Sequence, residues 1–127
     1  PDDYTEVDER MRPVVPEPEA PQSWTTVEAE VPYEGDVSRG TKLKIKIAES
    51  VYHKMVFRNK GESPAKIIRH MFRDGKELPD NEQGPVSYRT IRLHSGEDKT
   101  FTMDWDAGDV LILEVHEGTM HVEIYKE

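Results

Sequence analysis

Apolar and polar side chains alternate one by one along most of the chain after residue 22. This period of two, rich in Val, Ile and aromatic residues, is typical of β-strands that bury one face and expose the other. The alternating segments are residues 27–33, 42–47, 51–58, 65–73, 86–93, 100–105, 110–115 and 120–124. Segment 110–115 is nearly all apolar, which predicts a strand at the centre of a sheet.

Turn-forming residues separate these segments at intervals of roughly 8–12 residues, a spacing typical of antiparallel sandwiches and barrels. The pair Asp74-Gly75 is a strong hairpin signal. No segment keeps a helical period long enough to predict a helix. We therefore predict an all-β domain over residues 23–127, an antiparallel β-sandwich of immunoglobulin-like or jelly-roll-like type with about seven or eight strands.

The first 22 residues differ from the rest in composition. They contain five of the nine prolines and seven acidic against two basic side chains. Proline lacks a backbone donor, so this acidic segment is expected to be an extended N-terminal arm with polyproline II character. Such a segment buries too little apolar surface to order itself, so we expect a protein partner to hold it. Its apolar anchors are expected to be Tyr4, Val7, Met11, Val14 and Val15.

Charge is distributed in blocks along the chain. Residues 39–76 hold eleven bases and three acids, whereas residues 77–127 hold twelve acids and four bases. Within the basic block, Lys42, Lys44 and Lys46 fall on one face of a predicted strand. They could grip an acidic partner, such as the arm of a neighbouring subunit, or they could protect an edge strand from unwanted pairing. The net charge of −9 argues against nucleic acid as the main partner.

A run of turn chemistry carries a resemblance to a known class of domain. Asn59-Lys60-Gly61 and Ser63-Pro64-Ala65 lie between two predicted strands, and the similarity extends over about residues 43–115. It continues through Arg73-Asp74-Gly75-Lys76, the segment 93–98, Phe101 and Trp105. This pattern is similar to CARDB-like and related immunoglobulin-like modules. The resemblance implies a sandwich used for adhesion, spacing or docking, and it transfers no catalytic residues.

Metal binding is an alternative. His53 and Met55 lie two residues apart and so share a strand face, and imidazole with thioether suits copper. Asp104, Asp106 and Asp109 form an acidic turn that could offer oxygens to calcium, although the spacing differs from that of an EF-hand loop. The competing interpretation is that the methionines fill the core, the histidines lie on surfaces and the aspartates only form a turn.

Carbohydrate binding is a second alternative, with Trp24, Trp105 or Tyr88 as a stacking platform, although the alternation around Trp105 favours the core. Catalytic motifs are absent: the sequence has no nucleophile elbow, zinc-protease helix motif, P-loop or dinucleotide fingerprint. Glu114 interrupts an apolar strand and is expected to face solvent rather than a cleft. The chain is therefore not expected to be an enzyme or to use a cofactor.

The chain has no cysteine, no apolar run long enough to cross a membrane and no visible signal peptide. We expect cytoplasmic synthesis, no membrane or nucleic-acid partner, and a place at the surface of a larger homo- or hetero-assembly. The best-fitting class is a capsid decoration (cement) or accessory protein of a virion. A compact domain with a lacing arm and no active site suits that role.

Overall fold

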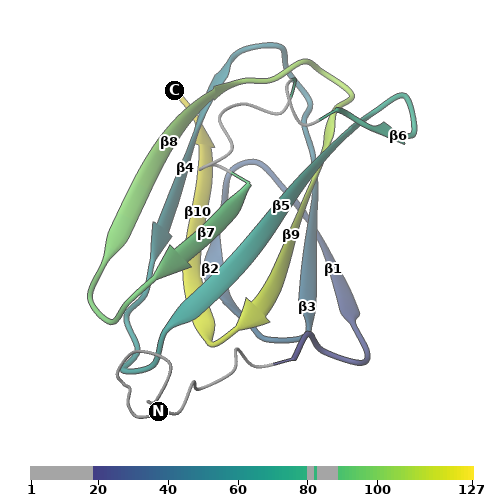
Figure 1. Ribbon diagram of the computed structural model, residues 1–127. Helices are drawn as coiled ribbons and strands as arrows, with labels where there is room; N and C mark the ends of the chain where they lie inside the picture. The colour runs from purple at the N-terminus through teal and green to yellow at the C-terminus, as the bar shows by residue number, and fades with distance from the viewer. Residues whose placement is uncertain (1–18, 80–81, 83–88) are drawn as a thin grey trace, which may run out of the picture.

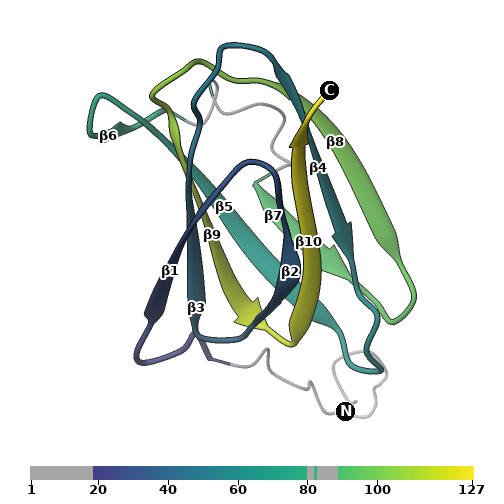
Figure 2. The same cartoon turned by 180° about the vertical axis from the view of Figure 1, so that it is seen from behind.

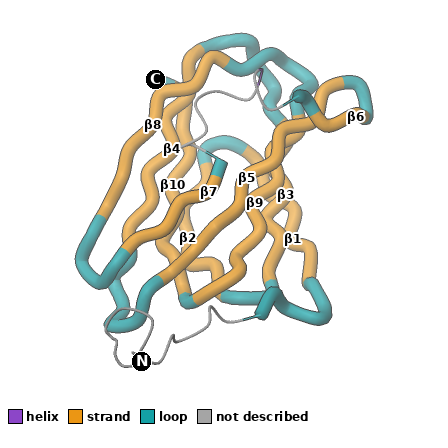
Figure 3. The backbone as a smooth tube through the Cα atoms, in the orientation of Figure 1, coloured by secondary structure: helices purple, strands orange, loops and turns teal. Residues whose placement is uncertain are grey.

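Two β-sheets packed face to face form the domain in the computed structural model, which describes residues 19–79, 82 and 89–127 (Figures 1 and 2). The described residues are strands and loops, with no α-helix (Figure 3). No helix in this part of the chain is long and apolar enough to cross a membrane. The predicted β-sandwich is therefore confirmed.

The six-stranded sheet follows the order β1-β3-β9-β5-β6, and β7 also pairs with β5. Its strands are β1 (Thr25–Glu30), β3 (Thr41–Lys46), β5 (Ala65–Arg73), β6 (Lys76–Glu77), β7 (Thr90–Leu93) and β9 (Val110–Glu117). Pairing within it is antiparallel except between β1 and β3, which run parallel. Strand β9 is therefore central, as its apolar sequence predicted.

The four-stranded sheet follows the order β2-β10-β4-β8 and is antiparallel throughout. Its strands are β2 (Tyr33–Ser38), β4 (Tyr52–Arg58), β8 (Asp98–Asp104) and β10 (Thr119–Lys126). Consecutive strands β1 and β2 thus belong to opposite sheets, so the chain crosses over the end of the sandwich between them.

The core lies between the two sheets, where the inner faces of most strands contribute buried apolar side chains, whereas β1 adds only the partly buried Ala29. Alternate residues of β4 and β9, such as Met55 and Phe57 or Leu111 and Leu113, have no exposed surface. Phe57 and Phe101 make an edge contact with ring centroids 5.9 Å apart. Burying several large apolar residues per sheet stabilises the face-to-face packing.

The described residues contain ten strands, so the expectation of seven or eight was too low. Segment 27–33 does not form one strand, because the chain turns at Val31-Pro32 and places β1 and β2 in different sheets. The short strand β6 adds another. Of the predicted strand 86–93, residues 90–93 form β7, while residues 86–88 lie outside the described part of the chain.

Turn chemistry closes the strands where the sequence predicted it. Asp74 and Gly75 both have positive φ, at 55° and 79°, as a two-residue hairpin of the type I′ class requires. The buried Asn59 side chain donates to the carbonyls of Ser63 (2.8 Å) and Leu93 (3.0 Å) and accepts from the amide of Gly61 (3.0 Å). Asn59 thereby ties the end of β4 to the loop before β5 and to the end of β7.

Adjacent residues of β9 test the assignment of inner and outer faces. Leu113→Ala should destabilise the protein by about 2–5 kcal/mol, since it leaves a cavity in the core. Ile112→Ala, on the outer face, should cost no more than about 1 kcal/mol, mainly through lower β-propensity. Urea unfolding followed by circular dichroism would measure both, and equal losses would contradict the assignment.

Candidate partner-docking surface

The outer face of the six-stranded sheet is organised in columns that follow the strands. On β3, Lys42, Lys44 and Lys46 form a lysine column whose cross-strand neighbours on β9 are Glu114, Ile112 and Val110. On the other side, β1 places Thr26, Glu28 and Glu30 beside the same lysines. The surface therefore changes from acidic to basic to apolar across three adjacent strands.

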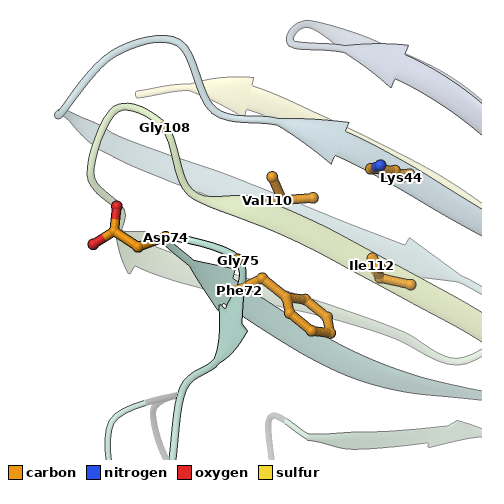
Figure 4. A pocket seen from close by; sticks show the side chains of 7 residues that line it. All are labelled: Lys44, Phe72, Asp74, Gly75, Gly108, Val110 and Ile112. Atoms are coloured by element: carbon orange, nitrogen blue, oxygen red, sulfur yellow. The ribbon is translucent and has the colours of Figure 1, made fainter.

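An open groove lies at the apolar side of the lysine column (Figure 4). Its volume is about 280 Å³. It is lined by Lys44, Phe72, Asp74, Gly75, Gly108, Val110 and Ile112. Phe72 pairs with Val110 across β5 and β9, and these two side chains and Ile112 remain only partly buried. The groove thus offers aliphatic and aromatic surface on the side of the sheet that faces away from the core.

Lys44 lines this groove, and Lys46 lies next to it as the cross-strand neighbour of Val110, which also lines the groove. Among the described residues, neither side chain forms an ion pair, although Glu28 and Glu30 are their neighbours on β1. Lys46 is exposed and Lys44 is half-buried. Two ammonium groups beside an apolar groove favour an occupant that combines negative charge with apolar side chains.

Lys42 is engaged differently, in a cluster at the other end of the column. Its Nζ lies 3.5 Å from Glu114 Oε2 and 5.3 Å from the ring centroid of Trp24, which makes an edge contact with His116. Glu114 Oε1 lies 3.1 Å from His116 Nε2 and 3.3 Å from His70 Nε2. Burial raises the pKa of Glu114, but its contacts with these histidines and the charge of Lys42 outweigh burial and lower it.

Glu114 is thus half-buried within a network on the sheet face, rather than simply solvated as expected. The network anchors Lys42 and Trp24 at one end of the surface, so these two side chains are less free to meet a partner than Lys44 and Lys46.

The three predicted lysines do share one face, but one interpretation of them is wrong. Strand β3 is not an edge strand, because β1 covers one side and β9 the other. The lysines therefore do not protect a free edge. The predicted arm anchors Tyr4, Val7, Met11, Val14 and Val15 lie outside the described residues.

The pair considered for copper is inside the protein. His53 and Met55 do share a face, but that face is the core, where they are 1% and 0% exposed. His53 Nδ1 lies 2.8 Å from the carbonyl of Val51, and its ring packs against Trp105 with centroids 5.2 Å apart. The expectation that the histidines lie on surfaces is therefore wrong for His53, which fills the core.

The acidic turn considered for calcium is organised by an arginine. The buried Asp109 carboxylate accepts from Arg73 Nε (2.8 Å) and Nη2 (2.9 Å) and from the backbone amide of Asp106 (3.0 Å). Asp106 also lies 3.3 Å from Arg73. The carboxylate oxygens of Asp109 thus bind the guanidinium of Arg73, a cation that the protein itself supplies.

The two described tryptophans considered as a stacking platform for carbohydrate lie in different environments. Trp105 is 3% exposed and belongs to the core, as its alternation favoured. Trp24 is half-buried against His116 and Lys42, and Tyr88 lies outside the described residues. The described tryptophans therefore do not form a shared flat platform.

Two features of the six-stranded sheet escaped the sequence argument. Phe72 and Ile112 interrupt the polar positions of their strands, and that departure from alternation was the available signal for the groove. Arg69 occupies an inward position of β5 and is fully buried. Burial, and then the charge of Arg89, lower the pKa of Arg69 to about 10.

Comparison with protein-family models, curated proteins and solved structures finds no match to this chain. The similarity to CARDB-like modules stays a prediction. Function is therefore inferred from the geometry of the surface.

The Asp109–Arg73 pair should make stability depend on pH. Burial raises the pKa of Asp109, but the hydrogen bonds from Arg73 and from Asp106, with the charge of Arg73, outweigh it and hold the pKa below its ordinary value. A carboxyl with a depressed pKa stabilises the fold above its unfolded pKa, about 3.9, and this contribution is lost as pH falls through the folded pKa.

Asp109→Asn should therefore cost about 1.5–3 kcal/mol near pH 7, and the difference from the wild type should shrink as pH falls below about 4. Asp106→Asn, at the exposed partner of the same arginine, should cost no more than about 1 kcal/mol. Urea unfolding across this pH range would measure both, and a difference that stays constant with pH would refute the assignment to Asp109.

Proposed function

We propose that this protein is a non-enzymatic docking subunit of a larger assembly, which binds neighbouring subunits through the groove and through its N-terminal arm. The groove is the observation that carries the proposal. It is apolar surface on the side of the sheet that the core does not cover, and it includes an aromatic ring. Apolar surface rimmed by charged side chains is typical of sites that bind another protein.

The occupant that fits best is the arm of a neighbouring copy. Residues 1–22 combine seven acidic side chains with apolar ones, including the pair Val14-Val15. The acids complement Lys44 and Lys46, and the apolar side chains match Phe72 and Ile112. An extended polyproline-type segment loses little entropy when it lies in a groove, which favours this mode of binding.

Arm and groove together give each subunit two weak contacts. Once one contact has formed, it raises the effective concentration for the other, so a subunit held by both is attached more tightly than by either alone. A capsid decoration or accessory protein needs this combination: a small stable domain, an extended arm, and binding to its neighbours without catalysis. We therefore propose, more specifically, that this protein is a capsid decoration or accessory protein.

Paramagnetic relaxation enhancement tests the contact between copies. Because the chain has no cysteine, Thr5→Cys gives one attachment point for a spin label in the arm. Spin-labelled protein at natural isotope abundance is mixed with ¹⁵N-enriched protein whose arm carries no spin label. Amide signals around Lys44, Phe72 and Ile112 should broaden, and the broadening should weaken with added salt, which screens the lysine charges.

Ile112→Glu in the ¹⁵N-enriched copy should abolish the broadening, since it places a carboxylate in the apolar groove. Thr102→Glu, on the outer face of β8 in the other sheet, is the matched control and should leave it unchanged. Spectra that do not change on mixing, or broadening that Ile112→Glu leaves intact, would contradict docking in the groove.

A further inference from the structure

A second cluster lies on the opposite side of the sandwich, on the outer face of the four-stranded sheet. There the edge strand β2 pairs with β10, so that Asp36 is opposite His121 and Glu34 is opposite Glu123. The His121 side chain is 11% exposed. Three carboxylates from two strands thus surround one largely buried imidazole.

Both nitrogens of this imidazole face carboxylate oxygens. His121 Nδ1 lies 2.7 Å from Asp36 Oδ1, while Nε2 lies 3.0 Å from Glu34 Oε2 and 3.6 Å from Glu123 Oε2. Ligand atoms of Glu34, His121 and Glu123 all lie within 4.8 Å of one another. This is close enough for one ion to bind all three.

The hydrogen-bond donors and acceptors around His121 favour a positive charge at Nε2, either a proton or a metal ion. A neutral imidazole that donates Nδ1–H to Asp36 turns the lone pair of Nε2 towards Glu34, and two acceptors at 3.0 Å repel each other. Glu34 and Glu123 are also directly opposite across the strands, where like charges destabilise a sheet. Either a second ring proton or a metal ion on Nε2 resolves both conflicts.

Arg58 supports one member of the set without filling this position. Its Nη1 lies 2.7 Å from Glu123 Oε2, so it orients that carboxylate. No contact between Arg58 and Glu34 is present among the described residues. The negative charge of the three carboxylates exceeds the positive charge of the one guanidinium. A divalent cation would balance the difference.

We propose that Glu34, His121 and Glu123 bind one divalent transition-metal ion, for which zinc is the best match. Zinc takes imidazole nitrogen and carboxylate oxygen as ligands, and three protein ligands leave a position for water or for a group from a partner. Asp36 acts on the far nitrogen of His121, the arrangement that fixes the tautomer and orientation of metal-binding histidines. The ion would fasten the edge strand β2 to β10.

This site differs from the residues that the sequence suggested for copper or calcium, since it depends on side chains 85 and 87 residues apart that only the register brings together. A competing set is His70, Glu114 and His116 on the other sheet. Both histidines contact Glu114, but the ligand atoms of this set do not all lie within 4.8 Å of one another, as those of Glu34, His121 and Glu123 do.

Zinc titration of the chelator-treated full-length protein tests the proposal by calorimetry and thermal melting. We expect one ion per chain and a higher melting temperature with zinc than without, because a ligand that binds only the native state stabilises it. His121→Asn and Glu34→Gln should each weaken binding at least about tenfold, and Asp36→Asn by about 10–100-fold. The double variant His70→Asn/His116→Asn is the matched control and should bind as the wild type does.

Histidine ¹⁵N spectra of the wild-type protein give a readout that does not depend on a variant folding. Zinc should shift Nε2 of His121 while Nδ1 keeps its proton. A His121 ring that carries protons on both nitrogens and does not respond to zinc would overturn the proposal, as the cluster would then be an ion pair only. Binding that survives His121→Asn but is lost in the double variant would also overturn it.

Discussion

Burial of the inner faces of two sheets is the constraint on which the other features of this protein depend. Once Leu43, Leu113 and their neighbours point into the core, the register of each strand decides which of the remaining side chains meet on the outside. The same rule operates on both sheets. On one it assembles lysines beside an apolar groove, and on the other it surrounds an imidazole with carboxylates.

The two outer faces therefore have different chemistry although they share one architecture. The six-stranded sheet keeps aliphatic and aromatic side chains on strands that are central, where a partner can lie across β3, β9 and β5. The four-stranded sheet gathers its acids near an edge, where β2 has only one neighbour. A central apolar surface suits docking of a chain segment, whereas an edge benefits most from an added cross-link between strands.

Local sequence predicted the features that depend on local physics. Alternation put His53 and Met55 on one strand face, and the left-handed preference of Asp74-Gly75 marked the β5–β6 hairpin. Sheet order depends instead on pairing between distant segments. The parallel β1–β3 pair made the lysine strand internal, and the β2–β10 pair created the His121 cluster, and neither is visible in the spacing of residues along the chain.

The parallel pairing of β1 with β3 has a mechanical consequence. The chain enters β1 at the end of the sheet where the amide of Thr25 donates to the carbonyl of Gly40, and β10 leaves at the opposite end (Figure 1). A pull on the N-terminal side therefore acts along the axis of β1. All six register pairs from Thr25–Thr41 to Glu30–Lys46 would carry the load together in shear, rather than opening one at a time. A tether attached at this end would yield only when the whole strand slides.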